Sequence, residues 1–226
     1  MRRNTRGTAS ALLVLVLVGT SACAVPEPWD GTREHVLTTF TVLADMTRAV
    51  AGDAVEVRSI TRPGAEVHDY EPTPSDLLTS EEADLILTNG LGMERWLDRF
   101  LEHAEAPRVI ASEGIEPIPV RSGEGQGDAN PHAWMSPRNA VRYVANIRDA
   151  LIRLAPEHAE GFRARAADYT RRLVDLDRSL RESLADVPPE HRALVTCEGA
   201  FSYLARDAGL REAYLWPVNS GRQGTP

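Results

Sequence analysis

Three side chains of types that bind metal ions stand just ahead of helical segments: His68, His132 and Glu198. His68 lies in "GAEVHDYEPTP", where Pro72 and Pro74 push the residues before them toward extended conformations. A single loop histidine is usually just solvated. Two imidazoles and a carboxylate at comparable places in the chain instead form a candidate metal site.

The local sequence around each candidate indicates where a helix begins. After His68, "TPSD" offers a capping hydroxyl, a proline at the first helical position and a carboxylate at the third. His132 lies in "NPHAWMSP", where Ser136 and Pro137 begin another helix. Glu198 ends an apolar strand in "TCEGAF". In open α/β folds, ligands bind at the edge where strands pass into helices.

Strand and helix patterns alternate along the chain. We expect strands over 35–40, 54–60, 84–90 and 108–112, with helices over 42–52 and 93–104 between them. This order predicts a parallel sheet covered by helices. The pattern resumes near the end, with strands over 193–199 and 212–218 and a helix between them that Gly209 closes.

The middle of the chain predicts long helices. A clean apolar stripe follows Pro137, and Pro156 restarts a helical pattern that continues to about Asp186. A helix of about 30 residues measures roughly 45 Å, too long for one small lobe, so we interpret it as a strut along two lobes. Its expected packing seam is Leu173, Leu176, Leu180 and Leu184.

The amino terminus reads as a secretion signal. Three arginines precede a short apolar run and then "GTSAC", and eight apolar residues are too few to span a bilayer. The pattern resembles a lipoprotein signal, with cleavage before Cys23 and lipidation of that residue. Cys197 is the other cysteine; it alternates with Glu198 along a strand, so we expect it to be small and buried rather than a ligand.

The three motifs together resemble those of the metal-binding lipoproteins of bacterial ABC importers for manganese, zinc and iron. The segments "VHDYEPTPSD", "NPHAWMSP" and "TCEGAFSYLARDAGL" through "GTP" carry this resemblance in order. It implies an α/β fold of two lobes with mostly parallel sheets, joined by one long helix, with the metal between the lobes. By motif position, the implied metal ligands are His68, His132 and Glu198.

The resemblance also implies that this chain is truncated at its carboxyl end, because such proteins continue past "GTP" and supply an aspartate as fourth ligand. The expected division of the chain is therefore as follows: a signal peptide over 1–22, a lipid-anchored tether over 23–33, an amino-terminal α/β lobe over 34–136, a helical segment over 137–189, and an incomplete second lobe over 190–226.

The expected function is extracytoplasmic capture of a divalent metal and its delivery to the membrane permease of an ABC importer. Manganese is favoured, because carboxylates can raise the coordination number and the loop before His132 lacks histidines; iron and zinc are alternatives. We expect a monomer, held by its lipid at the membrane outside the cytoplasm. The formal charge of −8 disfavours nucleic acid as a partner.

Three other functions stay open at this point. One is a zinc-specific binding protein of the same family. Another is a metal-dependent hydrolase, disfavoured because the chain contains neither HExxH nor G-x-S-x-G. The third is a surface adhesin, which leaves no sequence signature.

Overall fold

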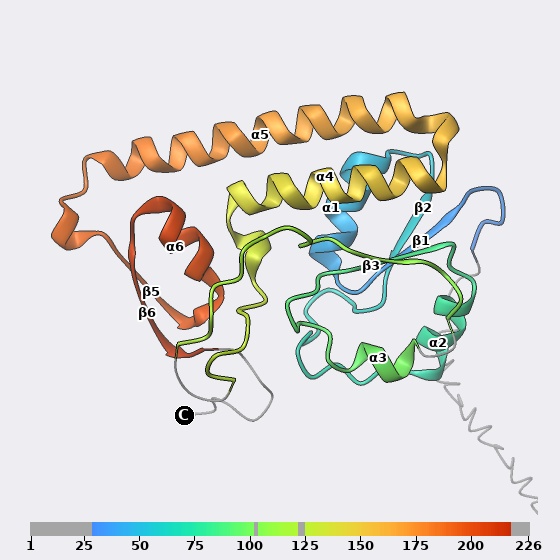
Figure 1. Cartoon of the computed structure of the whole chain (residues 1–226), viewed down its shortest axis with the longest axis horizontal. Helices are drawn as coiled ribbons and strands as arrows, with labels where there is room; N and C mark the ends of the chain where they lie inside the picture. Colours follow the sequence, from blue (N-terminus) through green and yellow to red (C-terminus); the bar gives the residue numbers. More distant parts are fainter. Residues whose placement is uncertain (1–28, 102–103, 122–124, 218–226) are drawn as a thin grey trace, which may run out of the picture.

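The computed structural model describes residues 29–101, 104–121 and 125–217. Its larger sheet has four parallel strands in the order β2-β1-β3-β4, which confirms the expected α/β fold (Figure 1). The strands are β1 (His35–Thr38), β2 (Glu56–Ser59), β3 (Leu85–Thr88) and β4 (Arg108–Ile110). Strand β3 is buried along its entire length, as its continuous apolar run predicts for a central parallel strand.

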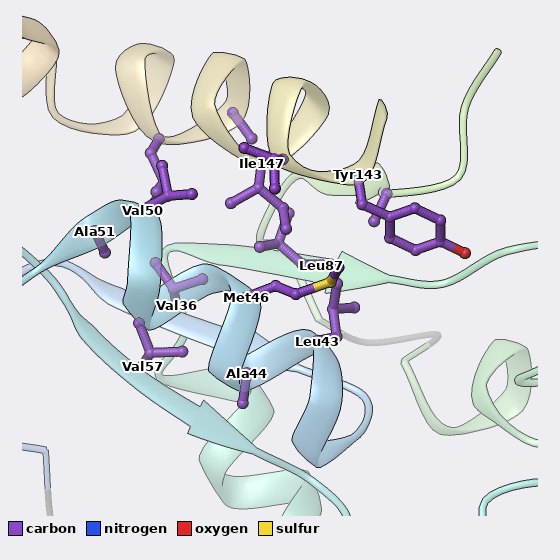
Figure 2. Packing of buried hydrophobic residues seen from close by; sticks show 14 of the residues in the cluster. Val36, Leu43, Ala44, Met46, Val50, Ala51, Val57, Leu87, Tyr143 and Ile147 are labelled. Atoms are coloured by element: carbon purple, nitrogen blue, oxygen red, sulfur yellow. The ribbon is translucent and has the colours of Figure 1, made fainter. Parts of the chain in front are cut away.

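The main core lies on one face of this sheet, under α1 (Thr41–Ala51) and α4 (Pro137–Leu154). Figure 2 shows Met46 and Val50 of α1 beside Leu87 of the sheet and Ile147 of α4. A second cluster covers the opposite face, where Leu97 and Leu101 pack on Leu37 and Ile86. The larger lobe is therefore covered on both faces.

Two short segments complete this lobe. Helix α2 (Pro74–Glu81) begins with the expected capping box, in which Thr73 and Asp76 satisfy each other's backbone N–H groups. The helix expected over 93–104 is wrong: α3 covers only Leu97–Phe100. Residues 91–96 form turns instead: the Met93 N–H donates to the Gly90 carbonyl, and positive φ at Leu91 and Gly92 prevents a right-handed helix from extending toward β3.

The long helix α5 (Ala159–Ala185) has 27 residues and follows a short 3₁₀ turn, η2 (Pro156–His158). At 1.5 Å per residue it measures about 40 Å. Figure 1 shows it running over α4 and onward above the second lobe, as expected for a strut. Its predicted seam is only partly buried: Leu173 is buried but Leu176 is 55% exposed, because the buried face of α5 continues through Asp177, which pairs with Arg138 of α4.

The second lobe is small. It contains a parallel pair, β5 (Ala193–Glu198) and β6 (Arg211–Trp216), joined through η4 (Gly199–Phe201) and α6 (Ser202–Ala208). Two 3₁₀ turns lead into other elements, η1 (Ala133–Met135) before α4 and η3 (Pro189–His191) before β5. Alternate residues of the pair face outward, among them Val195 and Leu215, which are 74% and 75% exposed. Within the described residues, the sheet of the second lobe therefore has one face without a covering layer.

Two sequence expectations need correction at the edges of these elements. Cys197 is exposed, not buried, because nothing in the described part of the chain covers the outer face of β5. Trp29, inside the tether expected over 23–33, is buried and stacks on His35 with ring centroids 4.4 Å apart. Packed structure therefore begins before residue 34; residues 1–28, with Cys23, lie outside the described residues.

None of the helices within the described ranges is long and apolar enough to cross a bilayer.

Candidate metal site

The structure brings His68, His132 and Glu198 together, although 130 residues separate the first from the last. The two Nε2 atoms of the histidines are 3.2 Å apart. Glu198 Oε1 lies 3.5 Å from His68 Nε2 and 3.2 Å from His132 Nε2. Two nitrogen atoms and one oxygen atom thus face a common point, which is the arrangement that a divalent transition metal requires.

The three side chains differ in how far they are withdrawn from water. The side chain of His132 is 4% exposed, that of His68 13% and that of Glu198 23%. The site is thus closed on the His132 side and opens past Glu198. Trp134 forms one wall, with its ring 5.3 Å from that of His132 and 4.9 Å from that of Phe40.

The loop that carries His68 is held by contacts on both sides of the histidine. Glu66 accepts hydrogen bonds from the backbone N–H groups of Val67 and His68. The indole of Trp96 donates to the Val67 carbonyl at 2.9 Å. Tyr70 packs on Trp96 and donates to Asp76, the N3 residue of α2. Fixed loop geometry reduces the entropy that metal binding must remove.

His132 is held by neighbours in its own motif. Its backbone N–H and its ring Nδ1 both lie near Asn130 Oδ1, at 3.0 and 2.9 Å. Asn89 donates to the carbonyl of Pro131, the residue between them. Metal-binding histidines usually donate their second ring N–H to such an acceptor, which turns the other nitrogen toward the ion.

A buried carboxylate, that of Glu94, holds the backbone at Asn89, the residue that bonds to Pro131. Glu94 is 8% exposed and accepts hydrogen bonds from Thr39 Oγ1 and from the backbone N–H groups of Asn89 and Gly90. Burial raises the pKa of Glu94 above its ordinary value, although these donors oppose the shift. Tyr143 donates to the side chain of Asn89 and completes the network.

Sequence reasoning identified the three converging residues but missed the polar residues behind them. Asn130 had a readable signal, because it stands two positions before His132 with a proline between them. Asn89 and Glu94 had no such signal: Asn89 was expected at the end of a strand and Glu94 in a helix, and neither pattern indicates a supporting polar residue.

A second group of ligand-type atoms lies at the opposite edge of the sheet, where Asp30, His35 and Glu56 come within 4.8 Å of one another. Arg33 pairs with Asp30 and Arg58 with Glu56. A backbone hydrogen bond from Thr32 and the pairing with Arg33 lower the pKa of Asp30 to about 2. Guanidinium groups already neutralise both carboxylates, so we assign no metal to this group.

The remaining histidines do not join the site. His158 and His191 end short 3₁₀ turns, and His103 lies outside the described residues. His35 is largely buried under Trp29.

Residues 36–226 match the family described as ZnuA, zinc-uptake complex component A, periplasmic. The chain is also 48% identical over 224 residues to the iron-binding protein YfeA of Yersinia pestis, covering 96% of this chain and 72% of YfeA. The chain belongs to the ZnuA family. Identity to the manganese ABC transporter substrate-binding lipoprotein PsaA of Streptococcus pneumoniae is 33%, over 96% of this chain and 73% of PsaA.

Solved structures of ZnuA-family relatives share the fold. The Mn-bound periplasmic metal-binding protein of candidatus Liberibacter asiaticus superposes with a TM-score of 0.78 at 36% identity, over 83% of this chain and 70% of the relative. The Zn(II)-bound ZnuA-like domain of Streptococcus pneumoniae AdcA gives 0.73 at 29%, over 83% and 68%. Members of this family are substrate-binding proteins of metal ABC transporters, so the chain is a binding protein rather than an enzyme.

Proposed function

We propose that His68, His132 and Glu198 bind one divalent transition metal, which the protein captures outside the cytoplasm and delivers to the permease of an ABC importer. The convergence of two Nε2 atoms and one carboxylate oxygen within 4.8 Å carries the proposal. Each ligand comes from a different part of the fold: the loop after β2, the turn before α4, and the end of β5. Binding therefore joins the two lobes.

We propose Mn²⁺ as the cargo, with Fe²⁺ as the alternative. Imidazole nitrogen and carboxylate oxygen both suit Mn²⁺ and Fe²⁺, and a carboxylate that binds through both oxygens favours these ions over tetrahedral Zn²⁺. The relative at 48% identity is named iron-binding and several at 30–33% are named for manganese, which supports both ions. A given site generally binds Zn²⁺ more tightly than Mn²⁺ or Fe²⁺, as the Irving–Williams order describes. Tight zinc binding in vitro would therefore not identify the cargo.

Thermal unfolding of the purified protein in chelator, Mn²⁺, anaerobic Fe²⁺ and Zn²⁺ tests the site. An ion that binds only the folded state at a hundredfold excess over Kd adds about 2.7 kcal/mol of stability. His68→Ala should remove that gain. His158→Ala is the matched control, because its side chain is 48% exposed and far from the site in the chain. A cooperative melt that no metal shifts would refute the proposal.

We further propose that Cys23 carries a lipid and holds a monomer at the outer surface of the membrane, with residues 1–22 removed as a signal peptide. The lipoprotein relatives support this placement. Cys23→Ser should move the protein from the membrane fraction to the soluble fraction of expressing cells, without changing metal binding. Membrane retention of Cys23→Ser would contradict the lipid proposal, and a dimer mass by light scattering would contradict the monomer.

The proposed division into lobes places 34–136 in the first lobe, 137–189 in the helical connection and 190–226 in the second lobe, with Trp29 to Arg33 joining the first. Limited proteolysis tests it: cleavage should concentrate between these units and spare α4.

A further inference from the structure

Asn130 is a buried residue whose polar groups all form hydrogen bonds. Its partners lie in both lobes. It is 3% exposed. Its backbone N–H donates to the Ile118 carbonyl at 2.8 Å. Its own carbonyl accepts from the hydroxyl of Tyr203, on α6 of the second lobe, at 2.7 Å. The same hydroxyl accepts from the Ile118 N–H at 3.1 Å, which closes the connection between the lobes.

The side-chain amide of Asn130 is oriented by the second lobe. Its Nδ2 lies 2.7 Å from the carbonyl oxygen of Gly199, the residue after Glu198, and 3.3 Å from Ser202 Oγ. A carbonyl can only accept a hydrogen bond, so the nitrogen end of the amide must face Gly199. The oxygen end then faces His132, where the backbone N–H of that residue also requires an acceptor.

This orientation decides where the proton of His132 resides. An amide oxygen 2.9 Å from Nδ1 can only accept, so neutral His132 carries its proton on Nδ1. Its Nε2 then presents a lone pair toward His68 and Glu198. The carbonyl of Gly199, next to Glu198 in the second lobe, thus fixes the tautomer of His132 through Asn130.

We infer that Asn130 is a positioning residue that couples the two lobes: it sets His132 in the metal-binding tautomer and ties it to the turn that carries Glu198. The inference rests on the metal site proposed above. It explains why an amide is suited to this position. A carboxylate could accept from His132 but could not donate to Gly199, and an aliphatic side chain could do neither.

Two substitutions separate the two roles. Asn130→Ala removes both hydrogen bonds, and Mn²⁺ affinity should fall about tenfold to a hundredfold, the usual effect of losing such a partner. Nitrogen NMR shifts of the metal-free protein above neutral pH should show that His132 no longer holds its proton on Nδ1 alone. Asn130→Asp should keep the Nδ1–H tautomer but lose the tie to Gly199, so that backbone amides of 199–202 exchange faster with deuterium.

Asn146 provides the matched controls, because its side chain also donates to two backbone carbonyls, those of Ala111 and Glu113, but it lies away from the site. Asn146→Ala and Asn146→Asp should leave Mn²⁺ affinity, the His132 tautomer and exchange at 199–202 unchanged. Similar effects from Asn146 variants would show a general loss of stability and overturn the inference.

Two other results would overturn it: wild-type tautomer and affinity in Asn130→Ala, or wild-type protection of 199–202 in Asn130→Asp. The tautomer and exchange measurements need no metal. A wild-type protein that failed to bind Mn²⁺ would therefore refute the proposed function, while these measurements would still decide the role of Asn130.

Discussion

The two lobes hold their parts of the metal site in different ways. The first lobe buries both faces of a four-stranded sheet, and strand β3 has no exposed residue. The second lobe has a two-stranded sheet with one face against α6 and the other exposed at Val195 and Leu215. A pair of strands alone is marginally stable in water. The position of Glu198 therefore depends on contacts with the first lobe more than the positions of the two histidines depend on the second.

The largest expected contrast is between a buried leucine of the first lobe and an exposed leucine of the second. Leu87 is fully buried in β3, so Leu87→Ala should lower the free energy of unfolding by about 2–5 kcal/mol. Leu215, 75% exposed on β6, should change it by less than about 0.5 kcal/mol when replaced by alanine. Urea titrations of both variants measure this difference. Equal losses would mean that the outer face of the second lobe is covered in solution.

Two glycines with positive φ give the next contrast. An added Cβ at Gly90 would lie 2.5 Å from Ile110 Cγ2, whereas at Gly209 it would meet nothing within 4 Å. Both alanine variants incur left-handed strain of about 1–2 kcal/mol. Overpacking should add about 1–3 kcal/mol for Gly90→Ala alone. Thermal unfolding measures the stability of both variants. An equal loss of stability would show that Ile110 in β4 moves aside at no energetic cost.

Tyr203→Phe tests the connection between the lobes directly. The change removes the hydroxyl between Asn130 and Ile118, leaving a buried acceptor and a buried donor without their partner. We expect a loss of about 1–2 kcal/mol, with faster hydrogen exchange in α6 and little change in β3. Faster exchange in β3 as well would mean that the lobes unfold as one unit.

The smallest expected effect concerns pH. Because burial raises the pKa of Glu94, the folded state binds its proton more tightly than the unfolded state. Stability should therefore fall as pH rises above the ordinary value of 4.5 toward the folded-state pKa. Glu94→Gln should flatten that part of the profile, measured by denaturant titration in chelator. Glu34 also has a raised pKa and contributes a slope of the same sign, so Glu34→Gln measures its share separately. An unchanged slope in Glu94→Gln would contradict the assignment.

Features set by local chemistry were predictable from sequence. The capping box at Thr73, the start of α4 at Pro137 and the closing of α6 by Gly209 follow from residues within a few positions. The three converging side chains were predicted mainly from the family resemblance. What sequence could not give was the partner of each polar group across the fold, because Asn130 meets Gly199 only through tertiary packing. Cys197 was misplaced for a similar reason: strand alternation gives its side, but not what covers that side.

The helix α5 also limits how the molecule can deform. It contains no proline, and its one glycine, Gly161, lies in the first turn, so it has no residue at which sharp kinks usually form. It contacts α1 and α4 at one end and α6 at the other. Such a helix acts as an elastic rod that resists bending and returns to its shape. We therefore expect metal binding to reduce the mobility of the loops that carry the ligands, with little change in the overall shape of the molecule.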